Sequence, residues 1–446
     1  MRPRAALAPG FVLACGAAYL LAAATGCTAS SDEVRPPPGQ FFFPTGLALD
    51  PAQSRLFVAN ANSELRWDSG TINVIDLDEV DRVIASRSGT RCQTDPEQVE
   101  TLVCDEESFI VGQAGVRIGN FATGLSVQDT GNGTARLIVP VRGDPSITWI
   151  DWDGSKLSCD DGAQNFAFCD DEHRLTSLRN NEALGLLPEE PFRTFVDAGG
   201  GYAVVTHLNS GDITLIDSRA GAAPIISDVA RDLFLGTSTT LPGGTAVAGR
   251  NPGSLDDLVY AVSRSEDRVQ MLTVERPTAN ALPYLVPSNY FFLDAAGGNN
   301  GSSSDSRGLA FTGDGNRMLA INRRPPTLQI YDSSLGPSGF PANTAVAIYD
   351  ICREASGLAV GNVGGGDLAL VTCFREGTAY VIDASGRRST DAIVRVGRGP
   401  FDVVISTIRK KAYITNFLED SIGVIDLAPG SARQFREVLR IGETRQ

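Results

Sequence analysis

The sequence is poor in the residues and motifs that most often carry catalysis. Only two histidines, His173 and His207, occur in 446 residues, so few candidates exist for a catalytic base of that kind. No GxSxG, HExxH or P-loop pattern is present, and the CxxCH motif of covalently bound haem is absent as well. These absences argue against the commonest hydrolase, metalloprotease, nucleotide-binding and cytochrome classes.

The cysteines also lack the CxxC spacing that is typical of metal sites. Of eight cysteines, Cys15 and Cys27 lie near the N-terminus. The other six form three local pairs, Cys92 with Cys104, Cys159 with Cys169, and Cys352 with Cys373. In an exported chain this arrangement predicts three disulfides. A metal site is the alternative, which the spacing and the scarcity of histidine disfavour.

Long apolar runs are missing except at the N-terminus, so no transmembrane helix is expected elsewhere. There, Arg2 and Arg4 precede the apolar segment 5–24, and small residues lead to Cys27, a pattern typical of a secretory signal. The triplet Ala24-Thr25-Gly26 before Cys27 resembles a bacterial lipobox, although its first residue is Ala rather than the commoner Leu. The resemblance implies a signal peptide over residues 1–26 and a lipid on Cys27. The alternative is an ordinary signal that is cleaved near Ala24.

The polar, proline-rich segment 27–40 is expected to be a lipidated tether. Thr28 stands where a retention Asp would follow the lipidated cysteine. By resemblance to enteric lipoproteins, this favours the outer membrane. The sequence therefore predicts a lipid-anchored protein of the bacterial cell envelope, attached to the membrane through Cys27.

A hairpin pattern recurs through the rest of the chain. In the stretch 410–427, one apolar run ends at Asn416 and a second ends at Asp426, a spacing of 426 − 416 = 10. Five other segments keep that spacing, namely Val141 to Asp151, His207 to Asp217, Ser263 to Thr273, Asn322 to Asp332 and Cys373 to Asp383. A seventh, Asn60 to Asp76, is six residues longer. Such an array indicates a repeat protein.

Each hairpin is preceded by a short apolar run, such as 45–49 or 401–405, and usually followed by another, such as 438–441. Four antiparallel strands repeated seven times predict an all-β fold, a seven-bladed β-propeller over residues 41–446. Length alone would suggest two or three domains, but units that cannot bury both faces must stack into one body. The last blade contains all four of its own strands, so Phe41 to Phe43 are expected to close the ring by packing on it.

The repeat resembles the YVTN-type propeller repeats of bacterial surface and periplasmic proteins. The resemblance rests on Tyr413-Ile414-Thr415-Asn416 with the run 422–426 in the last blade, and on Phe57-Val58-Ala59-Asn60 in the first. It covers about residues 41–442 and implies the fold. It says little of function, because the fold carries many unrelated activities.

In such blades, the links between blades share one rim with the turns between second and third strands. That rim collects Asn60, Asn416 and the residues Arg142, Arg193, His207, Arg264, Arg307, Arg323, Arg324, Arg353, Arg375 and Arg398. The acidic inserts 81–107 and 153–173 belong to the opposite rim, and the whole chain has a net charge of −15. We call the first rim the arginine-bearing face. The Cys352–Cys373 bridge is also expected there.

Clustered guanidinium groups suit carboxylate, sulfate or phosphate ligands, because each donates two parallel hydrogen bonds. The predicted ligand-binding residues are Arg142, His207, Arg264, Arg323, Arg353, Arg375 and Arg398. The alternative is that each arginine pairs with a nearby acid, such as Asp144, Glu266, Asp305, Glu354 or Glu376, and is merely solvated. For the acidic residues Asp151, Asp153, Asp160, Asp161, Asp170, Asp171 and Glu172, calcium binding is the alternative to a stapled, solvated loop. No EF-hand spacing is present, and we predict neither a metal nor another cofactor.

These observations favour a non-enzymatic lipoprotein whose rim binds an envelope protein or an acidic glycan. No catalytic residue is predicted under this hypothesis, and nucleic acid is not an expected partner for an exported acidic chain. The alternative is a hydrolase, since some seven-bladed propellers of related appearance are lactonases. Its site would lie at the channel mouth, with His207, Glu354 or Asp402, and Arg398. A third possibility is a scaffold for an assembly.

Overall fold

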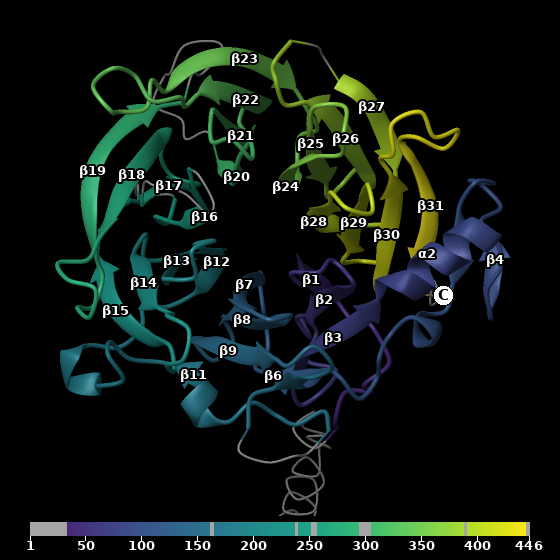
Figure 1. Cartoon of the computed structure of the whole chain (residues 1–446), viewed down its shortest axis with the longest axis horizontal. Coiled ribbons are helices and arrows are strands. Elements are labelled where there is room, and N and C mark those ends of the chain that lie inside the picture. Colours follow the sequence, from purple (N-terminus) through teal and green to yellow (C-terminus); the bar gives the residue numbers. More distant parts are fainter. Residues whose placement is uncertain are drawn as a thin grey trace, which may run out of the picture.

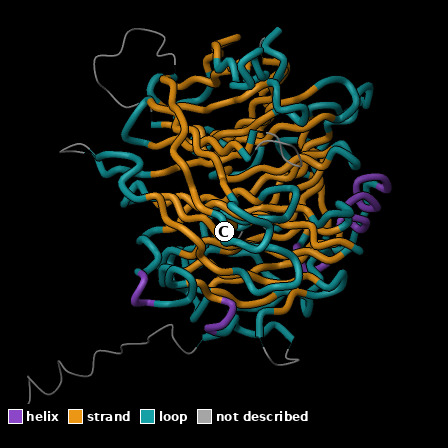
Figure 2. The backbone as a smooth tube through the Cα atoms, turned by 60° about the vertical axis from the view of Figure 1, so that its left-hand side comes forward, coloured by secondary structure: helices purple, strands orange, loops and turns teal. Residues whose placement is uncertain are grey.

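Seven antiparallel sheets stand around a common axis in the computed structural model (Figure 1). The structure describes residues 34–160, 165–236, 240–250, 257–293, 305–387 and 390–442. Each sheet contains one blade, whose own strands follow chain order from the axis outward. The predicted seven-bladed β-propeller is therefore confirmed. Helices are few and lie at the periphery of the body (Figure 2).

Three strands of every blade follow the predicted pattern. The inner strands are β1 (Pro44–Leu49), β7 (Ser126–Gly131), β12 (Pro191–Val196), β16 (Gly244–Gly249), β20 (Ser306–Phe311), β24 (Ala355–Asn362) and β28 (Pro400–Ser406). The second strands are β2 (Arg55–Asn60), β8 (Thr134–Val141), β13 (Tyr202–His207), β17 (Leu258–Ser263), β21 (Arg317–Arg323), β25 (Asp367–Cys373) and β29 (Lys411–Asn416). The third strands are β3 (Gly70–Asp76), β9 (Ser146–Trp152), β14 (Ile213–Asp217), β18 (Arg268–Glu275), β22 (Pro326–Asp332), β26 (Thr378–Asp383) and β30 (Ser421–Asp426).

The outer strands vary more. Six blades use β6 (Val116–Ile118), β15 (Ile225–Ala230), β19 (Tyr284–Phe292), β23 (Thr344–Asp350), β27 (Thr390–Arg395) and β31 (Arg436–Ile441). In blade 2 the outer position is divided between two short strands that pair with β9, namely β10 (Leu157–Ser158) and β11 (Arg174–Leu175). The short 3-10 helices are η2 (Glu106–Ser108), η3 (Asp171–His173) and η4 (Glu182–Leu184).

The hairpins are almost wholly apolar because every blade buries both of its faces. In β2, Leu56 and Val58 belong to the core shared with blade 7, whereas Phe57 and Ala59 belong to the core shared with blade 2. Successive side chains of a strand point to opposite faces, so one strand serves two cores. The core thus lies between blades, which is why neither face of the hairpin is polar.

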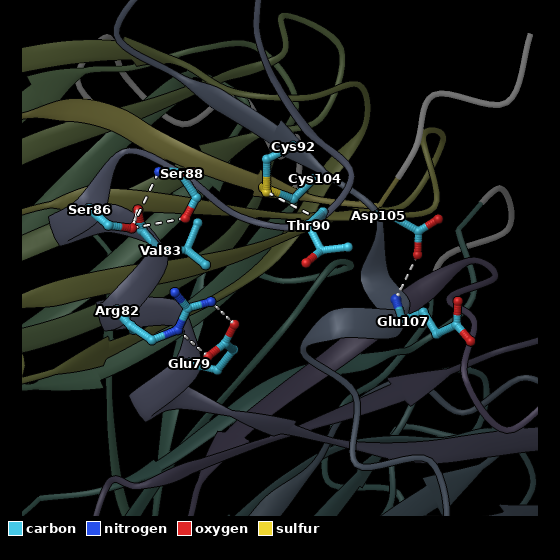
Figure 3. Close-up of a disulfide and its surroundings, with 10 residues drawn as sticks. All are labelled: Glu79, Arg82, Val83, Ser86, Ser88, Thr90, Cys92, Cys104, Asp105 and Glu107. Atoms are coloured by element: carbon cyan, nitrogen blue, oxygen red, sulfur yellow. Dashed lines mark hydrogen bonds and ion pairs between the residues drawn. A yellow bond between two sulfur atoms is a disulfide. The ribbon is translucent and has the colours of Figure 1, made fainter.

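The first acidic insert packs against the last blade. It forms α2 (Leu77–Ser86), β4 (Cys92–Thr94) and β5 (Leu102–Cys104), and these elements lie beside β31 in Figure 1. Strand β5 pairs in parallel with β31, and β4 pairs with β5, so the last sheet has six strands. The Cys92–Cys104 disulfide joins β4 to β5 (Figure 3). We call the segment from α2 through β5, residues 77–104, the clasp.

The predicted contact of Phe41 to Phe43 with the last blade is present as well. The rings of Phe43 and Phe417 are 5.3 Å apart, and the Phe43 N–H donates to Asp420 Oδ1 at 2.7 Å. The sequence did not predict that the clasp also joins the first blade to the last. Parallel pairing of β5 with β31 brings together strands whose residues are over 300 positions apart, and no local pattern reveals it.

All three predicted disulfides form: Cys92–Cys104, Cys159–Cys169 and Cys352–Cys373. Cys352 precedes β24 and Cys373 ends β25, so this bridge lies on the arginine-bearing face, as expected. Cys27 and the predicted signal peptide lie outside the described residues. The last part of the predicted tether, residues 34–40, packs along blade 1. There the Asp68 N–H donates to Val34 O at 2.9 Å, and Asn73 Nδ2 donates to Pro38 O at 2.8 Å. Among the residues that the structure describes, no helix is long and apolar enough to cross a membrane.

Candidate binding site at the arginine-bearing face

Each inner strand begins with one extra residue at the arginine-bearing face. In blade 1, Pro44 pairs with Asn60 and Gly46 with Ala59, which leaves Thr45 unpaired. Such a bulge turns a side chain away from its regular direction. Aligned on this register, the extra residues form an upper ring of Thr45, Thr123, Phe192, Thr245, Arg307, Ser356 and Phe401. The next residues form a lower ring of Gly46, Gly124, Arg193, Ala246, Gly308, Gly357 and Asp402.

Hydroxyl groups in the upper ring hold neighbouring blades together. Thr45 Oγ1 donates to Ala122 O at 2.8 Å, and Ser356 Oγ donates to Pro400 O at 2.7 Å. Thr123 and Thr245 make the same kind of bond to the next blade. Blades 3, 5 and 7 depart from this pattern with Phe192, Arg307 and Phe401. These three side chains are not required by the repeat, and they mark the site.

The side chains of the lower ring are small except in two blades. Gly or Ala occupies five positions, and Arg193 and Asp402 occupy the others, with Arg193 Nη1 3.3 Å from Asp402 Oδ1. A Cβ on Gly357 would come within 3.2 Å of the Asp402 Cα, so the glycine leaves room for this residue. The Leu47 N–H donates to Asp402 Oδ2 at 3.1 Å. The pair therefore joins blades 3 and 7 across the axis.

Burial dominates the electrostatics of this pair. Loss of solvent raises the pKa of Asp402, and Arg193 together with the Leu47 and Val403 N–H groups opposes that rise. The Arg193 guanidinium also lies 5.2 Å from the centre of the Phe401 ring. Asp402 is thus a carboxylate only 15% exposed, whose lone pairs are largely occupied by the protein.

Two adjoining cavities open from the rings toward the arginine-bearing face. The outer one, of about 390 Å³, is lined by three arginines and five phenylalanines, namely Arg142, Arg307, Arg323, Phe121, Phe192, Phe374, Phe401 and Phe417. The inner one, of about 190 Å³, is lined by Arg193, Asp402 and apolar inner-strand residues such as Leu47 and Leu309. Arg307 and Ser356 line both cavities. We call the two together the funnel.

Positive charge exceeds negative charge around the outer cavity. Arg142 forms an ion pair with Glu190, Arg307 pairs with Asp305 at 2.7 Å, and Arg375 pairs with Glu354 at 3.8 Å. Two further arginines have no ion pair within the described part of the chain. They donate to backbone carbonyls, Arg323 Nε to Ala355 O at 2.8 Å and Arg264 Nη2 to Leu208 O at 3.1 Å.

The electrostatics of Arg264 and Arg323 reflect this crowding of positive charge. Burial lowers the pKa of both guanidinium groups, and repulsion from Arg307 lowers it further, whereas attraction from Asp305 opposes the fall. An anion in the funnel would relieve this repulsion. The funnel is therefore suited to bind a negatively charged group.

The predicted site residues separate into three groups. Arg142 and Arg323 line the funnel, and Arg264 lies nearby without lining either cavity. Arg375 and Arg398 line a neighbouring cavity beside Leu418, and Arg353 is exposed just before β24. Of the expected acidic partners, Asp305 and Glu354 pair with rim arginines, whereas Asp144 pairs with Arg174 and Glu266 with Arg268.

His207 is fully buried rather than open to the funnel. Its Nδ1 lies 3.1 Å from Glu189 O and its Nε2 lies 2.8 Å from Thr214 Oγ1, so both ring nitrogens have protein partners. Burial lowers its pKa to about 4. His207 therefore ends its strand as a neutral structural residue, like Asn60 and Asn416 in other blades.

The funnel phenylalanines were absent from the predicted site, although Arg193 and Arg307 appeared on the predicted rim. In the sequence, Phe192 and Phe401 differ from the Thr or Ser that most blades have at the bulge position. This difference can be seen only once the register of the bulge is known and the blades can be aligned. On the acidic inserts, no group of three His, Cys, Asp or Glu side chains among the described residues could hold a metal ion. Asp161 lies outside those residues.

Comparison with known proteins supports the fold alone. No protein-family model matches the chain, and no curated protein matches it by sequence. A provisionally assigned 6-phosphogluconolactonase of Bacteroides fragilis superposes with a TM-score of 0.58 at 13% identity, over 88% of this chain and 99% of that one. A second such protein, of Bacteroides uniformis, gives 0.52 at 9% identity, over 80% and 87%. The propeller domain of Myceliophteria thermophila Cps50 gives 0.50 at 10% identity, over 86% and 96%.

Proposed function

We propose that this protein is a non-enzymatic, lipid-anchored protein of the bacterial cell envelope that binds an anionic ligand in its funnel. The observation that carries the proposal is a cavity of about 390 Å³ lined by Arg142, Arg307 and Arg323. Arg323 and the nearby Arg264 have no ion pair within the described residues and donate to backbone carbonyls. Guanidinium groups bind carboxylate, sulfate and phosphate through charge-assisted hydrogen bonds. An acidic glycan or an acidic segment of an envelope protein would supply such groups.

Three disulfides support the export of the chain, because such bonds persist in oxidising compartments. The lipobox-like sequence at Cys27 and the resemblance to YVTN-type repeats support attachment in the bacterial envelope, at the outer membrane. Under this proposal, Cys27 carries the lipid, and residues 28–33 connect it to the segment 34–40, which packs along blade 1.

Titration with inorganic sulfate and with an oligosaccharide of glucuronate tests anion binding by the purified full-length protein. Arg264→Gln and Arg323→Gln are expected to weaken binding by about tenfold each, because each removes a charged donor. Arg317→Gln is the matched control, since Arg317 pairs with Asp332 at the other end of β21, on the opposite rim. Equal binding by all variants would contradict the proposal.

The second candidate is a hydrolase acting on a lactone. The observations that favour it are the buried Asp402, whose pKa is raised, and the two similar structures provisionally assigned as lactonases. His207, the expected base, is buried, and both of its ring nitrogens already have protein partners. Asp402 pairs with Arg193 and accepts a hydrogen bond from the Leu47 N–H. Release of acid from a panel of lactones by the protein, and its loss in Asp402→Asn, would favour this candidate over binding alone.

A further inference from the structure

The funnel has walls of different chemistry. Part of the lining is aromatic, with the rings of Phe374, Phe401 and Phe417 lying 6.0 to 6.5 Å apart from one another. These rings come from blades 6 and 7. Arg307 and Arg323 of blade 5 line the same cavity, as do Arg142 and Glu354. A ligand in this space meets both phenyl rings and guanidinium groups.

Arg307 has a donor that no acceptor in the described part of the chain satisfies. Its Nη2 pairs with Asp305, but its Nε is buried and has no hydrogen-bond partner within the described residues. The Nε of Arg264 is in the same condition. Buried donors without a partner are costly. Of the two arginines, only Arg307 lines the funnel, so only Arg307 can offer a donor to a ligand there. Because Arg307 lines both cavities, an acceptor on that ligand would sit where the outer cavity narrows.

We propose that the funnel binds a small aromatic carboxylate, with the carboxylate on Arg307 and Arg323 and the ring against Phe374, Phe401 and Phe417. This inference rests on the proposed anion-binding function and specifies the ligand. A cavity of about 390 Å³ lies at the lower end of the range for small-molecule sites, about 300 to 1,000 Å³. It holds one or two fused rings and excludes a folded partner.

An aromatic body is favoured over an aliphatic one because of the geometry of the three rings. Phenylalanines with centroids 6.0 to 6.5 Å apart offer both ring faces and ring edges. Aromatic pairs gain stability beyond the area that they bury, because the negative face of one ring meets the positive edge of another. A planar carboxylate on a planar ring also matches the planar fork of a guanidinium group.

Three probes with related carbon skeletons test the proposal on the purified full-length protein by calorimetric titration. They are 2-naphthoate, its saturated counterpart decahydro-2-naphthoate, and the neutral 2-naphthamide. Binding of 2-naphthoate is expected to be about tenfold tighter than that of either comparator. Phe374→Leu and Phe401→Leu are expected to weaken 2-naphthoate binding by about three- to tenfold and to leave sulfate binding unchanged.

Arg307→Gln is expected to weaken both 2-naphthoate and sulfate by about tenfold or more. The control Phe340→Leu, at an exposed position between β22 and β23, should change neither. The leucine variants keep apolar volume, and near-UV circular dichroism confirms that they remain folded. Equal affinity for 2-naphthoate and decahydro-2-naphthoate overturns the aromatic assignment but leaves anion binding intact. Failure of both sulfate and 2-naphthoate to bind overturns this inference and the proposed function together.

Discussion

Single residues that break the repeat define the site. Thr or Ser at the upper ring joins one blade to the next in four blades, and Gly or Ala at the lower ring leaves space in five. Blades 3 and 7 replace both positions at once, with Phe192 and Arg193 in one and Phe401 and Asp402 in the other. The ion pair that results has a buried position, so each partner depends on the other.

Replacing Arg193 with Leu is expected to destabilise the protein by roughly 3 kcal/mol at pH 7, because it leaves a buried carboxylate without its cation. The pKa of Asp402 is already raised, and loss of Arg193 would raise it further. The folded variant then holds a proton that the unfolded chain releases, so its stability falls as pH rises above the ordinary aspartate range. Urea denaturation at pH 4 and pH 7 measures this loss.

The double change of Arg193 to Leu and Asp402 to Asn is the matched control, since it removes both charges. It is expected to be more stable than the single Arg193 variant at pH 7. A single variant as stable as the wild type would show that solvent, rather than Arg193, compensates Asp402.

Among the elements, the clasp is joined to the last blade by a buried cluster of charges. Strand β31 contributes Arg440 and Glu437, and Arg440 also contacts Asp95 of the clasp at 3.1 Å and Glu419 of blade 7 at 3.7 Å. Thr101 Oγ1 donates to Glu437 O at 2.8 Å. One buried guanidinium thus faces three carboxylates. Burial raises the pKa of Glu437 from 4.5 to about 7, against the attraction of Arg440.

This shift predicts a stability that depends on pH. Between pH 4.5 and about 7, the folded protein holds a proton on Glu437 that the unfolded chain has released, so the contribution of Glu437 to stability falls as pH rises. The full change amounts to about 3 kcal/mol. In Glu437→Gln, the free energy of unfolding is expected to lose this part of its pH dependence. Denaturation of both proteins from pH 4 to pH 8 checks it, and parallel curves would contradict the assignment.

At the scale of the whole molecule, the ring closes in two places. Phe43 contacts Phe417, and the clasp covers β31 at the outer edge. The clasp also reaches the turn between β28 and β29, where Arg409 pairs with Asp78 at 2.6 Å. Val34 is bonded at Asp68, just before β3, so the described chain enters the body at the arginine-bearing face.

The proposed anchor is tested by Cys27→Ala in a bacterial host. The wild-type protein is expected to incorporate labelled palmitate and to sediment with membranes, because a lipidated N-terminus partitions into the bilayer. The variant should lose the label and leave the membrane fraction, with the propeller still folded. An unlabelled wild-type protein whose N-terminus begins after Ala24 would instead establish ordinary secretory cleavage.

The sequence by itself determined the strands, the number of blades and the three disulfides. Each depends on residues close together in the chain, namely the ten-residue hairpins, the turns between them and cysteines separated by 10 to 21 positions. The arginine-bearing rim also followed from strand order, because alternate connections of an antiparallel blade reach the same side.

Only the tertiary structure decided how those residues are used. The sequence predicts His207 on the binding rim, but the packing of blade 3 buries it. Arg193 meets Asp402 because two bulges on opposite sides of the axis direct their side chains into the same space. The clasp binds β31 through residues 336 positions apart in sequence, as in the bond from Thr101 to Glu437. Contacts of this range depend on closure of the ring, which no local spacing encodes.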